Sequence, residues 1–404
     1  MSPRLFKAAA LLASVSLFYG FALSSEIKRN PKRPPRDWER ALDTGPVPKG
    51  LKTIRAEECG RCHTRIYREW KRSTHARAWQ DFQFQEELKK NRGLFVCINC
   101  HTPLQRQQDY LVEGLQGNNY LKPIKRPNPD FDPVLKEESI TCAVCHVRDG
   151  YVIGPYNTPD APHATRKDPK ALSEELCFRC HNVYDELSPQ LICVFRTGDE
   201  WLAGPYSGKG ITCISCHMPE VKRPLADGTG ARKTRRHLWA RSGIAKFIGE
   251  ERQVAQDSRS GMQILITPST DQAAPGETVY LGITYSNQKA GHHLPTGDPE
   301  RFIMIECRVE TGSDKVILKK EWRVGQKWEW TPAARKLSDN SLKPLEARTK
   351  NFSFTMPKGK GVWLKVTVTN HRIIEEFARE MNLIGRYPLK AAVLEKRLWI
   401  PAKH

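Results

Sequence analysis

The feature that most constrains this chain is a five-residue pattern, Cys-x-x-Cys-His, that recurs five times. Each copy places two cysteines three residues apart and a histidine directly after the second one, and the copies use ten of the twelve cysteines. A chance match is expected only about 0.01 times in a chain of this length, so the pattern reflects a chemical requirement. The five copies are Cys59–His63, Cys97–His101, Cys142–His146, Cys177–His181 and Cys213–His217.

This spacing is the one used for covalent attachment of haem. Two thiols add across the two vinyl groups of one porphyrin, and the adjacent imidazole binds the iron from one side. Each copy therefore predicts one c-type haem, five in all. Zinc knuckles and disulfides are the alternatives, but neither requires histidine directly after the second cysteine. The predicted attachment residues are Cys59, Cys62, Cys97, Cys100, Cys142, Cys145, Cys177, Cys180, Cys213 and Cys216, and the predicted iron ligands within the motifs are His63, His101, His146, His181 and His217.

Covalent haem attachment takes place outside the cytoplasmic membrane, so we expect a periplasmic or other extracytoplasmic protein. Arg4 and Lys7 precede an apolar run over 8–23, and the small residues Ala22 and Ser24 suit cleavage after Ser24. We therefore predict a signal peptide over 1–24. The alternative is an uncleaved membrane anchor, because the apolar run approaches the length of a membrane span and a basic, proline-rich linker follows it over 25–50.

The formal net charge of +20 would also suit a protein that binds nucleic acid or an anionic membrane. Five haems, however, would add about ten propionate charges of the opposite sign. We therefore expect that much of the lysine and arginine neutralises propionates and solvates the surface, and we expect no nucleic-acid partner. A basic patch that attracts an acidic redox partner is the alternative.

The chain divides near residue 245 into two parts with different sequence periods. In 51–245 the motifs start 38, 45, 35 and 36 residues apart, and proline-rich connectors and short helical stretches join them. We expect a mostly helical, loop-rich pentahaem domain whose core the haems fill. Over 253–404, alternating β-branched and aromatic runs predict an antiparallel, immunoglobulin-like β-sandwich of seven strands with a helix at 373–383. The predicted fold class is α+β, multidomain. The predicted strands are 262–269, 277–286, 301–310, 316–324, 348–357, 361–370 and 392–401.

Each iron also has a distal position, opposite the motif histidine. How the five distal positions are filled distinguishes an electron carrier from an enzyme. His75, His163 and His237 are the candidates in the haem part, and His75 lies on a stretch predicted to be helical over 65–91. The alternative for His75 is a histidine on the surface of a helix, and for His163 a loop histidine without a ligand role. For His237 the alternative is a place in a basic run that binds propionates. In the β part, one of His292 and His293 is a candidate, because both lie in the rigid turn AGHHLPTGDPER. The alternative there is a turn whose histidines bond local carbonyls.

Four residues of the same types are left over. We expect Cys193 and Cys307 to be buried free thiols, and the alternative is a disulfide between them. His371 and His404 are assigned no distal role.

The haem part resembles the multihaem cytochromes of the cytochrome c-554 type over about residues 55–240. The resemblance is carried by EWKRSTHARAW, CINCHTPL, ITCAVCHVRDG, RTGDEWLAGPYSGKGITCISCHMP and the later HLW, and GHHLPTGDPER is similar to a turn of related cytochromes that have a C-terminal β-domain. It implies stacked haem pairs, mostly with two histidine ligands, and it supports distal roles for His75 and His237. The best-known member has four haems and no such β-domain. Resemblance to pentahaem nitrite reductases would require one motif to end in lysine in place of histidine. No motif does, which weighs against that family.

We therefore expect a protein that carries electrons between periplasmic or membrane redox proteins rather than an enzyme. The alternative is an oxidoreductase that acts on a small nitrogen or sulfur oxyanion at one haem with an open distal side. The sandwich domain also predicts a role in assembly, as a homo-oligomer or a haem wire in which His292 or His293 reaches a neighbouring chain.

Overall fold

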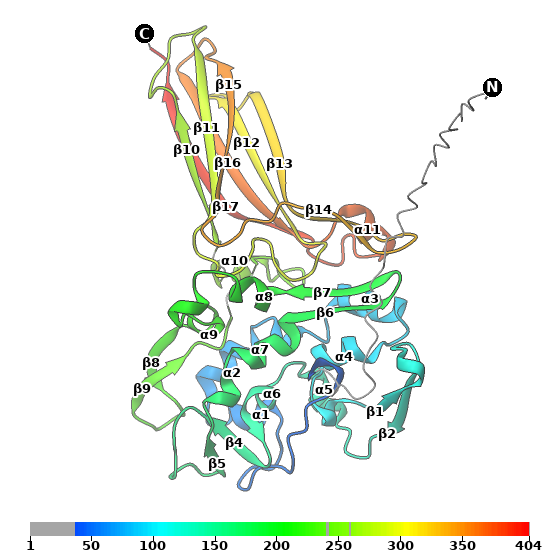
Figure 1. Ribbon diagram of the computed structural model, residues 1–404. Coiled ribbons are helices and arrows are strands. Elements are labelled where there is room, and N and C mark those ends of the chain that lie inside the picture. The colour runs from blue at the N-terminus through cyan, green and yellow to red at the C-terminus, as the bar shows by residue number, and fades with distance from the viewer. Residues whose placement is uncertain (1–36, 240–241, 258–259, 404) are drawn as a thin grey trace, which may run out of the picture. The chain divides into compact units, whose positions relative to one another are not determined.

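The computed structural model describes residues 37–239, 242–257 and 260–403 (Figure 1). The predicted signal peptide over 1–24, part of the basic linker and His404 lie outside the described residues. No helix in the described ranges is both long enough and apolar enough to cross a membrane.

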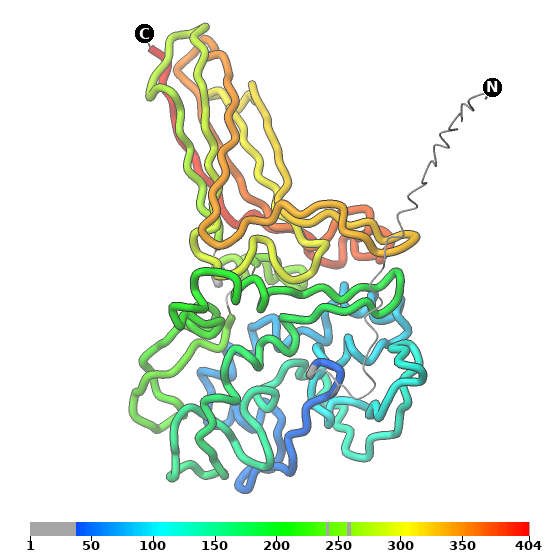
Figure 2. The backbone as a smooth tube through the Cα atoms, in the orientation of Figure 1, coloured from blue at the N-terminus to red at the C-terminus, as the bar shows by residue number. Residues whose placement is uncertain are grey.

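Short helices joined by long connections make up the motif region, residues 37–239 (Figure 2). Side chains of Asp81 and Asp132 cap two of the helices by accepting hydrogen bonds from backbone N–H groups. The predicted helical stretch around His75 is interrupted, and His75 begins a single 3-10 turn. The α-helices are α1 (Ala56–Gly60), α2 (Thr64–Lys71), α3 (Phe82–Lys90), α4 (Phe95–His101), α5 (Pro133–Glu137), α6 (Cys142–His146), α7 (Glu174–His181), α8 (Thr197–Leu202) and α9 (Cys213–His217). The 3-10 turns are η1 (Asp37–Glu39), η2 (His75–Arg77), η3 (Gln105–Gln107), η4 (Gln116–Asn118), η5 (Lys170–Leu172) and η6 (Ser207–Lys209).

Small sheets also occur in the motif region, beyond the expected helices and loops. Three are antiparallel two-stranded pairs, β1–β2, β6–β7 and β8–β9, and the fourth has the order β3-β4-β5. Their strands are β1 (Tyr110–Leu115), β2 (Pro123–Pro127), β3 (Val147–Arg148), β4 (Tyr151–Gly154), β5 (Thr165–Lys167), β6 (Asn182–Ser188), β7 (Leu191–Arg196), β8 (Glu220–Pro224) and β9 (Ala231–Arg235).

The sheet region, residues 260–403, consists of two antiparallel sheets around one core. The sheets have the orders β10-β11-β15 and β14-β13-β12-β16-β17. Alternate residues from both sheets, such as Leu281, Ile305 and Leu364, are buried together in one apolar cluster, which makes the arrangement a sandwich. The strands are β10 (Met262–Pro268), β11 (Thr278–Asn287), β12 (Phe302–Thr311), β13 (Val316–Glu329), β14 (Arg335–Asp339), β15 (Ala347–Thr355), β16 (Gly361–His371) and β17 (Lys390–Pro401).

Seven of these strands overlap the predicted ones, and β14 is additional. The helix α11 (Glu375–Glu380) lies within the predicted helix at 373–383, and α10 (Glu251–Asp257) was not predicted. Because all described residues belong to one compact unit, the sheet region can supply side chains to the motif region.

The apolar cores of the two regions differ in size. The sandwich core contains twenty buried residues, whereas the clusters within the motif region contain seven, six and three. The motif region therefore buries little apolar surface of its own.

Candidate haem-binding sites

Helical turns arrange the residues of the motifs. Four motifs lie wholly within α4, α6, α7 and α9, and the first begins in α1 and continues as a turn, in which the His63 N–H donates to the Cys59 carbonyl at 3.0 Å. Residues three and four positions apart share one face of a helix. Both thiols and the imidazole of each motif therefore face the same side, as haem attachment requires. We name each site by its motif histidine.

Four of the five motif histidines face a second imidazole. An iron between two imidazoles, each bound at about 2.0–2.1 Å through a nitrogen about 1.1 Å from its ring centre, separates the centres by about 6.2–6.4 Å. The observed separations match this value. The facing pairs are His63 and His163 at 6.4 Å, His75 and His181 at 6.3 Å, His146 and His237 at 6.1 Å, and His217 and His292 at 6.2 Å.

Backbone carbonyls orient many of these rings. The Nδ1 atoms of His63, His146, His237 and His292 each lie 2.8–3.0 Å from a carbonyl oxygen, and this contact directs Nε2 toward the facing ring.

Two rings lack such a contact. The Nδ1 atoms of His75 and His163 are buried without a hydrogen-bond partner within the described part of the chain. Either nitrogen of these two rings is therefore available to a metal.

The His101 site differs from the other four. The His101 ring stacks on Phe84, with centroids 3.4 Å apart, and its Nδ1 lies 2.6 Å from the Ala78 carbonyl oxygen. No histidine ring in the described ranges lies opposite His101, since the unpaired His371 stacks instead on Phe302 at 4.4 Å. This site therefore has one imidazole where the others have two.

His292 reaches the motif region from a turn between β11 and β12. The neighbouring His293 does not face a motif histidine, because its N–H donates to Glu200 Oε2 at 3.1 Å and its Nδ1 lies 3.8 Å from Glu200 Oε1. Thr296 also donates to Glu200 Oε2, at 2.6 Å. Of the two adjacent candidates, His292 thus enters the site and His293 attaches the turn to α8.

Burial keeps several of these imidazoles uncharged. Loss of solvent lowers the pKa of His75 to about 3 and that of His101, His181, His237 and His292 to about 4. The neutral imidazole is the form that binds a metal, so these rings are ready for ligation at neutral pH.

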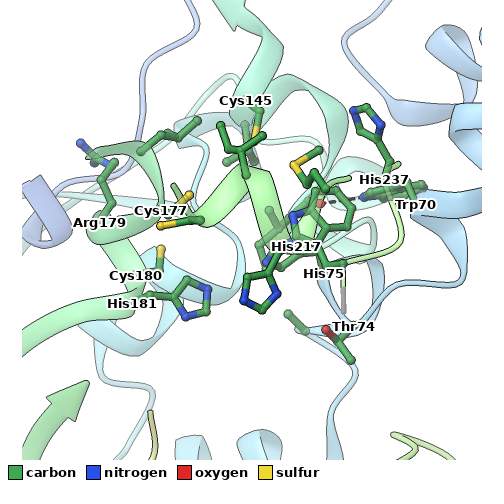
Figure 3. Close-up of a pocket in the computed structure, with 18 of the residues that line it drawn as sticks. Trp70, Thr74, His75, Cys145, Cys177, Arg179, Cys180, His181, His217 and His237 are labelled. Atoms are coloured by element: carbon green, nitrogen blue, oxygen red, sulfur yellow. Dashed lines mark hydrogen bonds between the residues drawn. The ribbon is translucent and has the colours of Figure 1, made fainter. Parts of the chain in front are cut away.

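Contacts between thiols of different motifs show which sites are neighbours. Cys59 lies within hydrogen-bonding reach of Cys142, Cys177 of Cys213, and Cys100 of Cys180, while Cys145 interacts electrostatically with Cys180. The sites therefore form a row in the order His63, His146, His181 and His217, and the His101 site branches from the His181 site. In Figure 3 the rings of His75, His181 and His217 project into one cavity beside Cys177 and Cys180.

One connected cavity of about 2630 Å³ runs through the motif region, against about 300–1,000 Å³ for an ordinary ligand pocket. All ten motif cysteines, all five motif histidines and the four facing histidines line it. No disulfide joins any of the twelve cysteines, Cys193 and Cys307 included. No cluster of His, Cys, Asp or Glu side chains in the described ranges is arranged to hold a bare metal ion. The donor set and the cavity thus fit haem rather than zinc or disulfides.

Sequence reasoning missed two carboxylates that hold the distal segments, Glu69 and Glu200. The His237 N–H donates to Glu69 Oε2 at 2.9 Å, as the His293 N–H does to Glu200. Each glutamate is followed by tryptophan, and these two Glu-Trp pairs within the resembling words are the signal that could have identified them.

Comparisons with known proteins agree with this geometry. A sequence model of the family described as Cytochrome c554 and c-prime matches residues 58–122. The penta-heme cytochrome c552 from Thermochromatium tepidum is 16% identical, with a TM-score of 0.56 over 86% of this chain and 99% of that one. The share of 86% exceeds the part of the chain before residue 253, so this match extends into the sheet region. The CARDB domain of a Pyrococcus furiosus protein is 14% identical and has a TM-score of 0.20, over 35% of this chain and 87% of that one.

No curated protein matches the chain. The family match and the shared fold confirm the expected resemblance: this chain resembles the multihaem cytochromes of the cytochrome c554 type, with a β-rich region added at the C-terminal end.

Proposed function

We propose that this chain is an exported multihaem cytochrome c that carries electrons between redox partners through five covalently attached haems. The observation that carries the proposal is the set of four facing histidine pairs. An iron held by two imidazoles has no free position for a substrate, which suits it to electron transfer. Haem supplies one-electron chemistry when bound, and the chain supplies ligands, burial and spacing.

The proposal is tested by mass and spin state. Intact mass of the purified protein should correspond to five haems on a chain that begins after Ser24, recovered from the periplasmic fraction. Low-temperature electron paramagnetic resonance of the oxidised protein should show low-spin signals from the four sites with facing imidazoles. High-spin signals from most of the haems would contradict the electron carrier. A chain that retains residues 1–24 in the membrane fraction would instead support an N-terminal anchor.

The His101 site favours a second function, that of an oxidoreductase acting on a small nitrogen or sulfur oxyanion. Its support is the absence of a facing imidazole among the described residues. Charged groups also gather beside this site: Glu87 interacts with Cys97 and with Asp298. Burial, followed by the charge of Asp298, raises the pKa of Glu87 to about 7, so this carboxyl could exchange a proton near neutral pH. Arg301 lines the cavity and interacts electrostatically with Glu87, so it could hold an anion here.

Ligand binding separates the two functions. Cyanide or nitric oxide added to the oxidised protein should shift one high-spin signal in the wild type. That signal should disappear when haem attachment at the site is prevented by Cys97→Ala/Cys100→Ala. If no haem responds to either ligand, the enzyme function is excluded and the electron carrier stands alone.

The surface around the His63 site suits an acidic redox partner. It lies at one end of the row, where the Cys62 side chain is exposed, and the β8–β9 hairpin packs beside it, with the Asp227 N–H donating to the Cys62 carbonyl at 2.8 Å. Exposed basic residues lie on α2 and on this hairpin or directly after them: Arg65, Arg68, Lys71, Arg72, Lys222, Lys233 and Arg236. Such a face accelerates association with an acidic protein in a salt-dependent way.

This docking face is tested with flavodoxin, an acidic one-electron carrier, as the probe. Arg65→Gln/Arg68→Gln should lower the rate constant for reduction by flavodoxin hydroquinone about 5–10-fold at low salt and flatten its salt dependence. Lys358→Gln/Lys360→Gln removes the same charge from exposed positions of the sheet region and should change the rate less than about twofold. Equal losses in both variants would contradict a localised docking face.

The finer assignments of the sheet region are also proposals. We infer an immunoglobulin-like sandwich from its two antiparallel sheets and shared core.

A homo-oligomer or haem wire is tested by sedimentation velocity of the holoprotein. His292 faces His217 of its own chain, so we expect assembly to survive His292→Ala.

A further inference from the structure

Two Glu-Trp pairs in the motif region make corresponding contacts at two different sites. Glu69 and Trp70 lie near the end of α2, and Glu200 and Trp201 lie in α8. Their hydrogen bonds span from 10 to 168 positions of the sequence, so neither set follows from local helix geometry.

Each tryptophan holds the motif side of a site. The Trp70 indole N–H donates to the Ile140 carbonyl at 2.8 Å, and the Trp201 indole N–H donates to the Ile211 carbonyl at 2.9 Å. Both carbonyls lie two residues before the first cysteine of a motif, and both segments are spelled Ile-Thr-Cys. The two tryptophans are 6% and 8% exposed, so these bonds are protected from water.

Each glutamate holds the distal side of the same site. Glu69 accepts the N–H of His237, which faces the motif histidine His146. Glu200 accepts the N–H of the residue after His292, which faces His217. In both cases one dipeptide thus spans from the motif to the facing histidine.

Other contacts of Glu69 show that it does not serve its own helix. A carboxylate in the last turn of a helix is disfavoured by the helix dipole. Glu69 instead accepts hydrogen bonds from Arg223 at 2.7 and 2.9 Å and from Arg236 at 2.9 Å. Arg223 lies in β8, and Arg236 lies directly after β9 and directly before His237, so the carboxylate fixes the hairpin segment that leads to the histidine.

Glu200 secures its turn by different partners. Its Oε2 atom accepts both the His293 N–H and the Thr296 hydroxyl. Thr296 in turn lies 2.8 Å from the hydroxyl of Thr197 in α8. Oε2 therefore accepts both hydrogen bonds from the turn, while Oε1 lies 3.8 Å from His293 Nδ1, beyond hydrogen-bonding distance.

We propose that Glu69 and Glu200 are positioning residues, each acting with its tryptophan neighbour as a clamp that sets the separation of the two axial histidines of one haem. The proposal rests on the proposed haem sites, and it assigns the Glu69 clamp to the His146 site and the Glu200 clamp to the His217 site. Partners outside the first coordination shell commonly change metal affinity about 10–100-fold.

The two carboxylates respond differently to replacement by glutamine. Glutamine at 69 places an amide N–H₂ group where one carboxylate oxygen accepted donors, so Glu69→Gln should loosen His237. Glutamine at 200 retains one oxygen that can accept both donors, so Glu200→Gln should behave as the wild type and Glu200→Ala should loosen His292.

The experiment measures spin state and cyanide affinity in the holoprotein. His237→Ala and His292→Ala define the low-spin signals of the two sites. Glu69→Gln should weaken the signal that His237→Ala removes, and Glu200→Ala the signal that His292→Ala removes. Each should tighten cyanide binding at that haem by about 10–100-fold. Glu395→Gln, which removes a carboxylate paired with Arg397 and Lys365 in the sheet region, should leave every signal unchanged.

Other outcomes would overturn the clamps. Loss of both signals together, or an equal effect of Glu200→Gln and Glu200→Ala, would indicate a general structural role. If a variant does not fold, Trp70→Phe and Trp201→Phe remove only the indole N–H and should affect the same signals separately. Intact mass distinguishes failure of the proposed function from failure of the clamps. If the wild type carries no haem at these motifs, the proposed haem sites are wrong. Unchanged low-spin signals in a Glu69→Gln variant that carries all its haems would overturn only the clamps.

Discussion

At the scale of single residues, the motif histidines were assigned by spacing, whereas the facing histidines depend on contacts that spacing cannot express. The Cys-x-x-Cys-His pattern is local, so its role in haem attachment can be predicted without knowledge of the fold. Which of His292 and His293 faces a motif histidine depends on Glu200, 93 positions before His293.

Glu69 makes the residue-scale contacts sensitive to acid. Burial disfavours its charged form, but the hydrogen bonds from Arg223 and the His237 N–H, with the charges of both arginines, hold its pKa below the ordinary 4.5. In this range the unfolded chain binds more protons than the folded one, so stability is full above pH 4.5 and falls as pH drops through the folded pKa.

We therefore predict a specific acid dependence. The wild-type free energy of unfolding should fall between about pH 5 and pH 3, and Glu69→Gln should lose about 3–5 kcal/mol at pH 7 because it breaks a buried ion pair. The variant should then show a smaller further loss on acidification. Urea unfolding followed by circular dichroism at pH 7 and from about pH 5 to about pH 3 measures this. An equal fall of the free energy of unfolding with pH in the two proteins would contradict the prediction.

At the scale of elements, helices and long strands could be predicted and the short hairpins could not. The strands of the sandwich alternate buried residues with exposed or half-buried ones, as in β16, and this pattern is visible in the sequence. The strand β14 is exposed at every position, and β8 and β9 are mostly charged, so their pairing leaves no apolar alternation to detect. The interruption of the helix near His75 was missed for a similar reason, because the η2 turn depends on contacts with the segment around Ser139.

A glycine positions the element that carries His163. Gly50 has a φ of +94°, and a Cβ atom there would lie 2.2 Å from the Pro162 carbonyl oxygen and 2.9 Å from the His163 Cα. Only a residue without a side chain allows the linker to approach this loop so closely.

Replacement of Gly50 by alanine should therefore displace His163. We expect a cost of about 1–3 kcal/mol from the backbone conformation and partial loss of one low-spin signal, the one that His163→Ala also removes. Gly385→Ala is the control, since its φ is +74° but nothing lies within 4 Å of an added Cβ. It should lose comparable stability without any change in spin state. Loss of the same low-spin signal in both variants would show that backbone strain, rather than contact with the loop, is responsible.

At the scale of the whole molecule, the two regions differ in what fills their interiors. The sequence indicated this difference, since 51–245 has little contiguous apolar sequence and the later part alternates regularly. The pairing of sites could not be predicted, because the thiol contacts join residues as distant as Cys59 and Cys142. The cavity that brings these residues together exists only in the folded chain.

The difference between the interiors predicts how the chain behaves without haem. The motif region has apolar clusters of at most seven buried residues, too few to offset the conformational entropy of ordering about 200 residues. The sheet region keeps its twenty-residue core regardless of haem. In cells that cannot attach haem to Cys-x-x-Cys-His motifs, limited proteolysis with mass spectrometry should therefore find cleavage throughout 37–239 and protection of 260–403. The holoprotein, treated in parallel, should resist cleavage in both regions. Equal protection of both regions in the haem-free chain would mean that the polypeptide alone holds the motif region together, and the row of histidine pairs would then be preformed rather than organised by its cofactors.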